Sequence, residues 1–290
     1  MSRKERKNMS DLKNKRIINV APTGSWPTKE NNPNVPLHPE EIAEEIYNCW
    51  KAGAATAHIH CRDDDGKPAM IAEKFVEVFR ILREERKDCD IILNTTTSGG
   101  MGLTEDDRLR PCFTVRPELA SFDAGTMNWQ HKTVFNNNPM FLERLATMLN
   151  EINVKPEIEI FDVGMLYNAQ YYIKNGFLKT PAYFQFCMGA PGGMTATTKN
   201  LVILKDVMDE IAPGSPWSAF GIGKGAMEIM YAAIAMGGHI RVGMEDNVLY
   251  RKGELATSNM QFVERAKRAI EEFGCEVATP DEARQILNLK

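Results

Sequence analysis

Short apolar runs alternate with amphipathic stretches along almost the whole chain, and this alternation constrains the fold more than any other feature. Eight runs are rich in apolar or β-branched residues and have the length of strands: 16–21, 56–60, 90–95, 118–123, 156–162, 182–187, 217–222 and 238–242. The intervening stretches have a helical period, as in Phe75, Val78, Phe79 and Leu82. Eight strand–helix units in series favour parallel strands joined by right-handed crossovers. We therefore predict an α/β fold, a closed (β/α)8 TIM barrel.

An open, doubly wound sheet is the competing architecture, and the turn after the first run argues against it. Residues 21–27 read A-P-T-G-S-W-P, without the G-x-G-x-x-G pattern of a dinucleotide-binding turn. The length of 290 residues suits one barrel, and no linker or repeat divides the chain. We expect a single catalytic domain over residues 16–290, preceded by a disordered basic tail over residues 1–15.

Composition excludes several kinds of partner. The chain is 43% apolar and 26% charged, enough for a full core, and its net charge of −4 gives no electrostatic basis for nucleic-acid binding. No apolar run reaches the length of a membrane span, and the basic N-terminus lacks the apolar stretch of a signal peptide. The six cysteines are scattered, so a disulfide framework is not expected. A cytoplasmic protein with small-molecule partners is the expectation.

The second strand run ends in two histidines that point to metal chemistry. His58 and His60 are two residues apart, so on a strand both imidazoles face the same side. Two nitrogen donors suit a divalent transition metal, and Glu245, after the eighth run, can add a carboxylate and leave one coordination position open. A pair of hydrogen-bonded barrel histidines without metal remains the alternative.

Further polar residues follow other strand runs, where the functional residues of barrels gather. Arg241 and Asp246 flank Glu245 and could act on a substrate, although an ordinary salt bridge would also explain them. The loop with Thr97, Ser98 and Gly100 could donate hydrogen bonds to an anion or could simply lead into a capped helix.

A late glycine-rich turn offers a possible cofactor contact. Lys224 lies in the sequence G-I-G-K-G at 221–225, and late barrel loops often bind phosphate groups. Lys224 is therefore a candidate for binding a phosphate-bearing cofactor, and a tight turn with no ligand is the alternative.

Taken together, these motifs resemble the β-keto acid cleavage enzymes, including those that act on 3-keto-5-aminohexanoate. The resemblance runs from Ile17 to Lys290 and rests on segments 22–24, 58–66, 117–128, 189–194, 221–223 and 237–247. It implies a zinc barrel that condenses a β-keto acid with acetyl-CoA, as co-substrate, to give acetoacetate and a new acyl-CoA. The family is typically oligomeric, so the resemblance also implies a homotetramer.

The resemblance assigns roles residue by residue. His58, His60 and Glu245 match the zinc ligands. Asp246, held by Arg241, matches the group that manages the proton at C2 of the keto acid. Three further positions match contacts to the carboxylate and keto oxygens of the substrate: Thr97, Gly100 and Ser121. Asp123 lies at the same end of the barrel and would favour a cation.

One departure from the family pattern concerns the substrate tail. The aminohexanoate-cleaving members carry a glutamate near the end of the first strand, which pairs with the ammonium group of the substrate. Aligned on Thr23 and Gly24, this chain has Trp26 at that position. An indole would suit an apolar tail or, by a cation–π attraction of about 0.5–2 kcal/mol, a quaternary ammonium such as that of dehydrocarnitine. Packing of the loop is the other explanation of Trp26.

Two further classes of function remain open. An amidohydrolase-type barrel also uses two histidines in this spacing, but it would place more histidines at the ends of the fifth and sixth strands, where this chain has Asp162 and Cys187. A non-catalytic barrel that binds a ligand without metal belongs to a different class. Metal analysis of the purified protein would separate it from an enzyme.

Overall fold

Eight parallel strands close into a barrel in the computed structural model, which describes residues 12–100 and 102–289. In chain order they are β2 (Ile18–Val20), β3 (Thr56–Ile59), β6 (Ile92–Thr95), β7 (Leu119–Asp123), β10 (Lys155–Ile160), β11 (Tyr183–Met188), β12 (Trp217–Gly221) and β13 (His239–Val242). Pairing of β13 with β2 closes the sheet. The predicted (β/α)8 TIM barrel is confirmed, and each strand lies within two residues of its predicted bounds.

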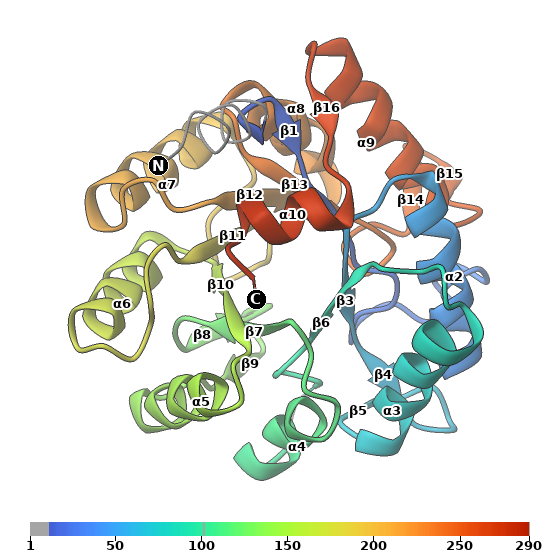
Figure 1. Cartoon of the computed structure of the whole chain (residues 1–290), viewed down its shortest axis with the longest axis horizontal. Coiled ribbons are helices and arrows are strands. Elements are labelled where there is room, and N and C mark those ends of the chain that lie inside the picture. Colours follow the sequence, from blue (N-terminus) through green and yellow to red (C-terminus); the bar gives the residue numbers. More distant parts are fainter. Residues whose placement is uncertain (1–11, 101, 290) are drawn as a thin grey trace.

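Helices surround the barrel on the outside (Figure 1). They are α2 (Pro39–Ala52), α3 (Ala72–Arg80), α4 (Glu105–Val115), α5 (Pro139–Glu151), α6 (Val163–Lys174), α7 (Thr198–Ile211), α8 (Ala226–Ala235) and α9 (Met260–Glu272). A π turn, η1 (Ile81–Glu85), continues α3. Phe75, Val78 and Leu82 of this segment are fully buried, as their helical spacing predicts.

The N-terminal end of the barrel is closed by the last helix, α10 (Pro280–Ile286), which crosses in front of the strands in Figure 1. Thr279 accepts a hydrogen bond from Glu282 N, and the Glu282 carboxylate accepts one from Thr279 N, which together form a capping box. Ala283 and Leu287 pack on the first residues of the strands in a separate apolar cluster. This end therefore has a structural role.

The predicted tail, residues 1–15, is described by the structure only from residue 12 onward. Residues 1–11 of the predicted tail lie outside the described residues. Lys15, which the prediction places in the tail, instead begins β1 (Lys15–Arg16), which pairs with β16 (Glu276–Val277). Its ammonium group lies 2.8 Å from Glu276 Oε2 and 2.9 Å from Glu282 Oε1. Backbone pairing and two ion pairs explain why this residue belongs to the folded part.

The C-terminal end of the barrel is open and is walled by three hairpins that the sequence did not reveal. They are β4 (Cys61–Arg62) with β5 (Pro68–Ala69), β8 (Met127–Trp129) with β9 (Thr133–Phe135), and β14 (Leu249–Arg251) with β15 (Glu254–Leu255). Each hairpin follows a barrel strand and extends the wall beyond it. Together with the strand ends they enclose a cavity of about 1930 Å³.

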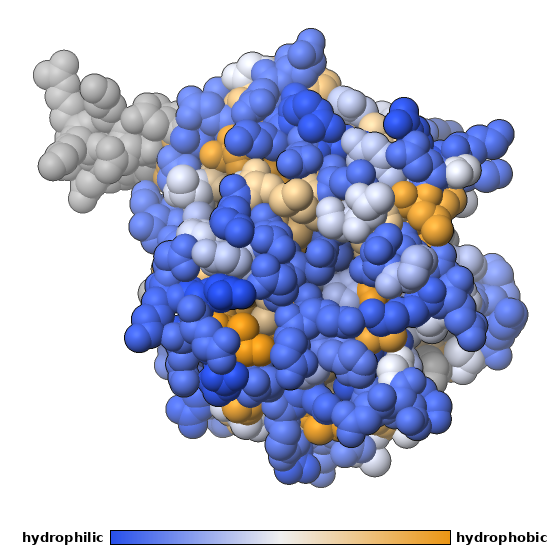
Figure 2. Space-filling model, turned by 90° about the vertical axis from the view of Figure 1, so that its right-hand side faces the viewer, coloured by the Kyte–Doolittle hydropathy of each residue, from blue (hydrophilic) through white to orange (hydrophobic). Residues whose placement is uncertain are grey.

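The outer surface is mostly hydrophilic on the face seen in Figure 2, where apolar side chains form only scattered patches. Among the helices of the described residues, none combines the length and the apolar character that a membrane crossing requires.

Candidate active site

His58, His60 and Glu245 converge at the C-terminal end of the barrel. His58 belongs to β3, His60 follows it directly, and Glu245 lies just after β13. His60 Nε2 is 3.5 Å and His58 Nε2 is 3.9 Å from Glu245 Oε1. Zinc–ligand bonds of 2.0–2.2 Å in a tetrahedron place ligand atoms about 3.3–3.6 Å apart. The His60 distance matches this range and the His58 distance is slightly longer, so the three side chains form a group that could hold a metal ion.

Two loops position Glu245 by packing against each other. Gly24, in the loop after β2, has a φ of +66°, and a Cβ there would lie 2.4 Å from Glu245 Cγ. Glu245 N donates to Ala21 O at 3.1 Å, and Asn259 joins the two loops by accepting from Met244 N and donating to Pro22 O. A side chain at position 24 would displace the carboxylate, so glycine is required there.

The protonation of the two histidines suits a metal. Burial, assisted by the positive charge of Arg241, lowers the pKa of His58 and of His60 well below the usual histidine value. Both imidazoles are then neutral at physiological pH, the form that binds metals. Glu245 Oε2 is buried and has no hydrogen-bond partner among the described residues, so this carboxylate has a lone pair to offer. Two imidazoles and one carboxylate fit a zinc ion with an open position.

Arg241 connects the candidate metal ligands to the neighbouring acids. It donates from Nε to Asp246 Oδ2 at 3.0 Å and from Nη2 to Asp246 Oδ1 at 2.9 Å, a two-point contact. Nη2 also reaches Glu245 Oε1 at 2.5 Å, and Nη1 lies 3.7 Å from Glu159 Oε1. Burial raises the pKa of Asp246 to about 6 despite the adjacent guanidinium. Arg241 therefore orients a carboxylate whose pKa suits proton transfer near neutral pH.

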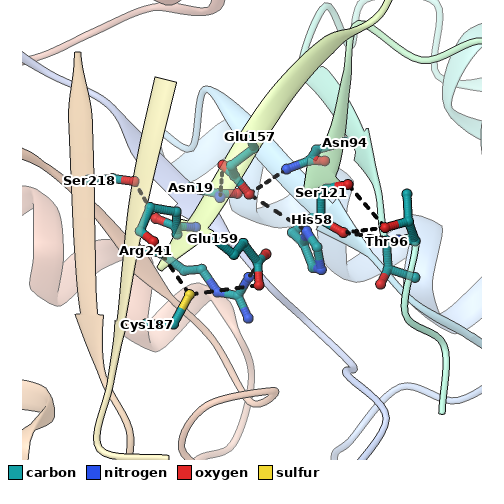
Figure 3. Close-up of polar contacts among 12 residues, drawn as sticks. Asn19, His58, Asn94, Thr96, Ser121, Glu157, Glu159, Cys187, Ser218 and Arg241 are labelled. Atoms are coloured by element: carbon teal, nitrogen blue, oxygen red, sulfur yellow. Dashed lines mark hydrogen bonds and ion pairs between the residues drawn. The ribbon is translucent and has the colours of Figure 1, made fainter. Parts of the chain in front are cut away.

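Two glutamates of β10 enter the barrel side by side, and their surroundings differ (Figure 3). Glu157 accepts from Asn94 Nδ2 at 2.7 Å and from Asn19 Nδ2 at 3.4 Å, and its Oε1 lies 3.9 Å from His58 Nδ1. Glu159 accepts from the Cys187 thiol at 3.7 Å, its Oε1 lies 3.7 Å from Arg241 Nη1, and its carboxyl contacts that of Asp123. Glu157 backs the candidate ligand His58, and Glu159 faces the cavity.

Of the residues expected from the sequence to contact substrate or cofactor, some line the cavity and others do not. Trp26, Gly100, Asp123 and Lys224 line the cavity with the candidate metal ligands. Thr97 and Ser121 do not, because they bond to each other: Thr97 N donates to Ser121 Oγ at 2.9 Å and Thr97 Oγ1 to Ser121 O at 3.0 Å. The neighbouring Thr96 and Ser98 line the cavity instead.

Thr96 is the residue that the sequence reasoning missed. Its hydroxyl bonds to that of Ser98 at 3.1 Å, and both side chains belong to the cavity wall. A signal was present in the chain: Thr96 and Ser98 have the same strand parity as Asn94, which points into the barrel.

The mouth of the cavity contains the two remaining candidates. The Trp26 side chain is 63% exposed, so the ring is not packed into the core. Lys224 is exposed in the short turn η2 (Gly223–Gly225) before α8. Both side chains are placed where they could contact the outer part of a bound ligand.

Asp162 and Cys187 stand where an amidohydrolase-type barrel would have further histidine ligands, and both have other roles. Asp162 caps α6 by accepting from Met165 N at 3.1 Å, and Cys187 is fully buried against Glu159. Neither adds a ligand to the pair of histidines.

Comparisons with known proteins place the chain in a family. A model of the beta-keto acid cleavage enzyme family matches residues 15–289. A 3-keto-5-aminohexanoate cleavage enzyme of Fusobacterium nucleatum is 44% identical over 276 residues, covering 95% of this chain and 98% of that protein. A 3-dehydrocarnitine:acetyl-CoA trimethylamine transferase of Rhizobium meliloti is 34% identical over 294 residues, with 94% and 96% covered. ObcA, solved in a ternary complex with a C4-CoA adduct and oxalate, shares the fold with a TM-score of 0.78 at 18% identity, covering 89% of this chain and 68% of that one. The chain belongs to the β-keto acid cleavage enzyme family.

Proposed function

We propose that this chain is a zinc-dependent enzyme that condenses a β-keto acid with acetyl-CoA and releases acetoacetate and a new acyl-CoA. Family membership makes it a β-keto acid cleavage enzyme, an acyltransferase that uses acetyl-CoA. The observation that carries the zinc assignment is the convergence of His58, His60 and Glu245 on one point, next to the Arg241–Asp246 pair.

Zinc bound by these ligands would supply a Lewis acid for the keto and carboxylate oxygens of the substrate, which makes the C2 proton easier to remove. Asp246 is the base for that proton. It lines the cavity while only 8% exposed, and the two-point contact with Arg241 fixes its orientation. The same guanidinium holds Glu245, so one cation sets the positions of the base and of a metal ligand.

The cavity has room for two substrates. Ordinary ligand pockets measure about 300–1,000 Å³, and this one measures about 1930 Å³. The carboxylate and keto end of the β-keto acid is assigned to Gly100 and to the Thr96 and Ser98 hydroxyls, which line the cavity. Thr97 and Ser121 bond to each other behind this wall and are assigned to holding the loop in place. Lys224, at the rim, is assigned to the phosphates of acetyl-CoA.

The tail of the β-keto acid is assigned to Trp26 and Asp123, which line the same cavity. Two relatives carry the names of acids with a positive charge on this tail, 3-keto-5-aminohexanoate and 3-dehydrocarnitine, and both acids are candidates here. A cytoplasmic homotetramer is part of the proposal by family analogy.

Metal content and activity of the purified protein test the proposal together. We expect about one zinc per chain, and His58→Ala should lose both the zinc and acetoacetate formation. His131→Ala is the matched control, because His131 lies exposed on the β8–β9 turn and outside the cavity wall. Asp246→Asn should keep the zinc and lower turnover about 10²–10⁴-fold.

Three outcomes would contradict the proposal. Full acetoacetate formation by metal-free protein would remove the metal from the reaction. Unchanged turnover in Asp246→Asn would show that another group moves the C2 proton. A protein that binds no zinc and forms no acetoacetate would instead fit a non-catalytic ligand-binding barrel.

A further inference from the structure

We infer that Glu157 is a positioning residue for the candidate metal site: it accepts a hydrogen bond from Nδ1 of His58 and thereby directs Nε2 of the same imidazole to the metal. The inference rests on the proposed function, because it concerns a ligand of the zinc that this function requires. It goes beyond that function, since Glu157 is not among the described residues that line the cavity and acts only through His58.

The His58 ring lies between two carboxylates that come from different parts of the barrel. Its Nε2 is 3.9 Å from Glu245 Oε1, and its Nδ1 is 3.9 Å from Glu157 Oε1. Figure 3 shows the second contact, in which Glu157 of β10 reaches His58 of β3 through the barrel interior. An imidazole that offers Nε2 to a metal beside Glu245 therefore presents Nδ1 to Glu157.

The Nδ1 atom of His58 requires an acceptor when the metal is bound. A neutral imidazole that binds a metal through Nε2 carries its proton on Nδ1, and a buried N–H without a partner is unfavourable. Nδ1 is buried and has no hydrogen-bond partner among the described residues. Within the part of the chain that the structure describes, Glu157 is the only carboxylate within 4.0 Å of Nδ1. Hydrogen bonds measure about 2.7–3.2 Å, so a movement of about 1 Å closes this contact.

The Glu157 carboxylate is itself held in place by two asparagines. Its Oε1 accepts from Asn94 Nδ2 at 2.7 Å, and its Oε2 accepts from Asn19 Nδ2 at 3.4 Å. Each carboxylate oxygen has two lone pairs, so Oε1 can accept from His58 as well as from Asn94. Asn94 is also the direct partner of His58 in the pairing of β3 with β6. The same neighbour therefore aligns the candidate ligand and the carboxylate behind it.

Glu157 could instead bind a metal directly, because His58, Glu157 and Glu159 also offer ligand atoms within 4.8 Å of one another. Both oxygens of Glu157 already accept hydrogen bonds, whereas Glu245 Oε2 has no partner among the described residues. Glu245 also lines the cavity that a substrate enters, and the described wall of this cavity does not include Glu157. These contacts favour Glu157 as the partner of a metal ligand over Glu157 as a ligand.

Zinc affinity is the first test of this role. The dissociation constant of zinc is measured at a fixed pH by competition with a chromophoric chelator, after circular dichroism has shown that each metal-free variant is folded. Glu157→Leu removes the acceptor and should weaken zinc binding about 10–100-fold, and Glu157→Gln, which keeps a neutral acceptor, about tenfold. Ser218→Ala is the matched control, because Ser218 is fully buried in the same barrel interior but bonds to Tyr183 and Gln185. Its zinc affinity should equal that of the wild type.

The position of the proton on His58 is the second test, read by nitrogen NMR of the histidine rings. We expect the proton on Nδ1 in the zinc-loaded and in the metal-free wild type, and a smaller share of this tautomer in metal-free Glu157→Leu. The inference is overturned if the proton lies on Nε2, if both Glu157 variants bind zinc as tightly as the wild type, or if Ser218→Ala weakens binding equally. A wild type that binds no zinc contradicts the proposed function instead. The metal-free spectra then decide the His58–Glu157 contact alone, which a proton on Nδ1 supports and a proton on Nε2 excludes.

Discussion

Glu157 and Glu159 are both glutamates and lie two positions apart on the same strand, yet their side chains have different partners. Glu157 is fully buried and accepts hydrogen bonds from two asparagine amides. Glu159 is nearly as buried, but it lines the cavity and contacts another carboxyl, that of Asp123, across the strand pair. The difference arises from the position along β10, since Asn19 of β2 and Asn94 of β6 reach the first glutamate through the barrel interior, whereas the paired strand β7 brings Asp123 to the second. Of the two buried carboxyls, one is therefore bound within the barrel and the other belongs to the wall of the cavity.

Removing Arg241 should give the largest effect, because this residue is the main cation among the acids at the barrel mouth. Arg241→Ala leaves Asp246, Glu245 and Glu159 without their shared partner, and we expect a loss of about 3–5 kcal/mol in the free energy of unfolding. Urea denaturation of the zinc-loaded protein measures it. Arg241→Lys keeps a charge without the two-point contact and should lie in between. An alanine variant as stable as the wild type would show that these acids are neutral in the folded protein.

A matched pair of substitutions tests the comparison directly. Glu157→Gln replaces an acceptor with a donor that faces Asn94 or Asn19, and should cost about 1–3 kcal/mol of unfolding free energy. Glu159→Gln replaces a carboxyl whose pKa burial and the neighbouring Asp123 raise well above the usual value, and should leave stability unchanged or raise it by about 0.5–2 kcal/mol. Thermal and urea unfolding of both variants give the answer. Equal losses would mean that Glu159 is as structural as Glu157.

The smallest effect on stability is expected at the rim. Trp26 is 63% exposed, so Trp26→Ala should change the free energy of unfolding by less than about 0.5 kcal/mol. If the ring covers a cationic tail, the same change should lower kcat/KM for 3-keto-5-aminohexanoate about two- to thirtyfold relative to 3-keto-5-methylhexanoate, in which a methyl group replaces the ammonium. Trp26→Phe should retain part of the preference. A large loss of stability in the alanine variant would return Trp26 to a packing role.

The barrel could be predicted because its determinants are local. Strand runs and helical stripes each leave a period in the sequence, and the eight strands were found within two residues of their predicted bounds. The hairpins were not found. The β8–β9 hairpin turns through Gln130 and His131, which adopt positive φ without the glycine that usually signals such a turn. The other two hairpins turn at Gly66 and Gly253, but their strands have only two or three residues, too few to leave a period in the sequence.

Of the candidate site, the sequence predicted only those residues that lie at the ends of barrel strands. His58, His60, Arg241, Glu245 and Asp246 meet because all five follow or end barrel strands. The orientation of Thr97 depends on hydrogen bonds that it donates to Ser121, on the next strand, and the sequence pattern alone does not contain that contact. The difference between Glu157 and Glu159 is hidden for the same reason, since it arises from side chains on other strands of the barrel.

The close packing of Gly24 against Glu245 limits how this protein can diverge. The loop that presents Trp26 to the cavity also seats a candidate metal ligand two residues earlier, and Arg62 holds its far side by donating to Pro27 O at 2.9 Å. Selection for a new substrate can therefore act freely at position 26, whereas a change at position 24 would alter metal affinity and substrate preference together. Within this loop, position 26 can therefore vary and position 24 cannot. Directed evolution that randomises both positions should recover glycine at 24 in every active clone.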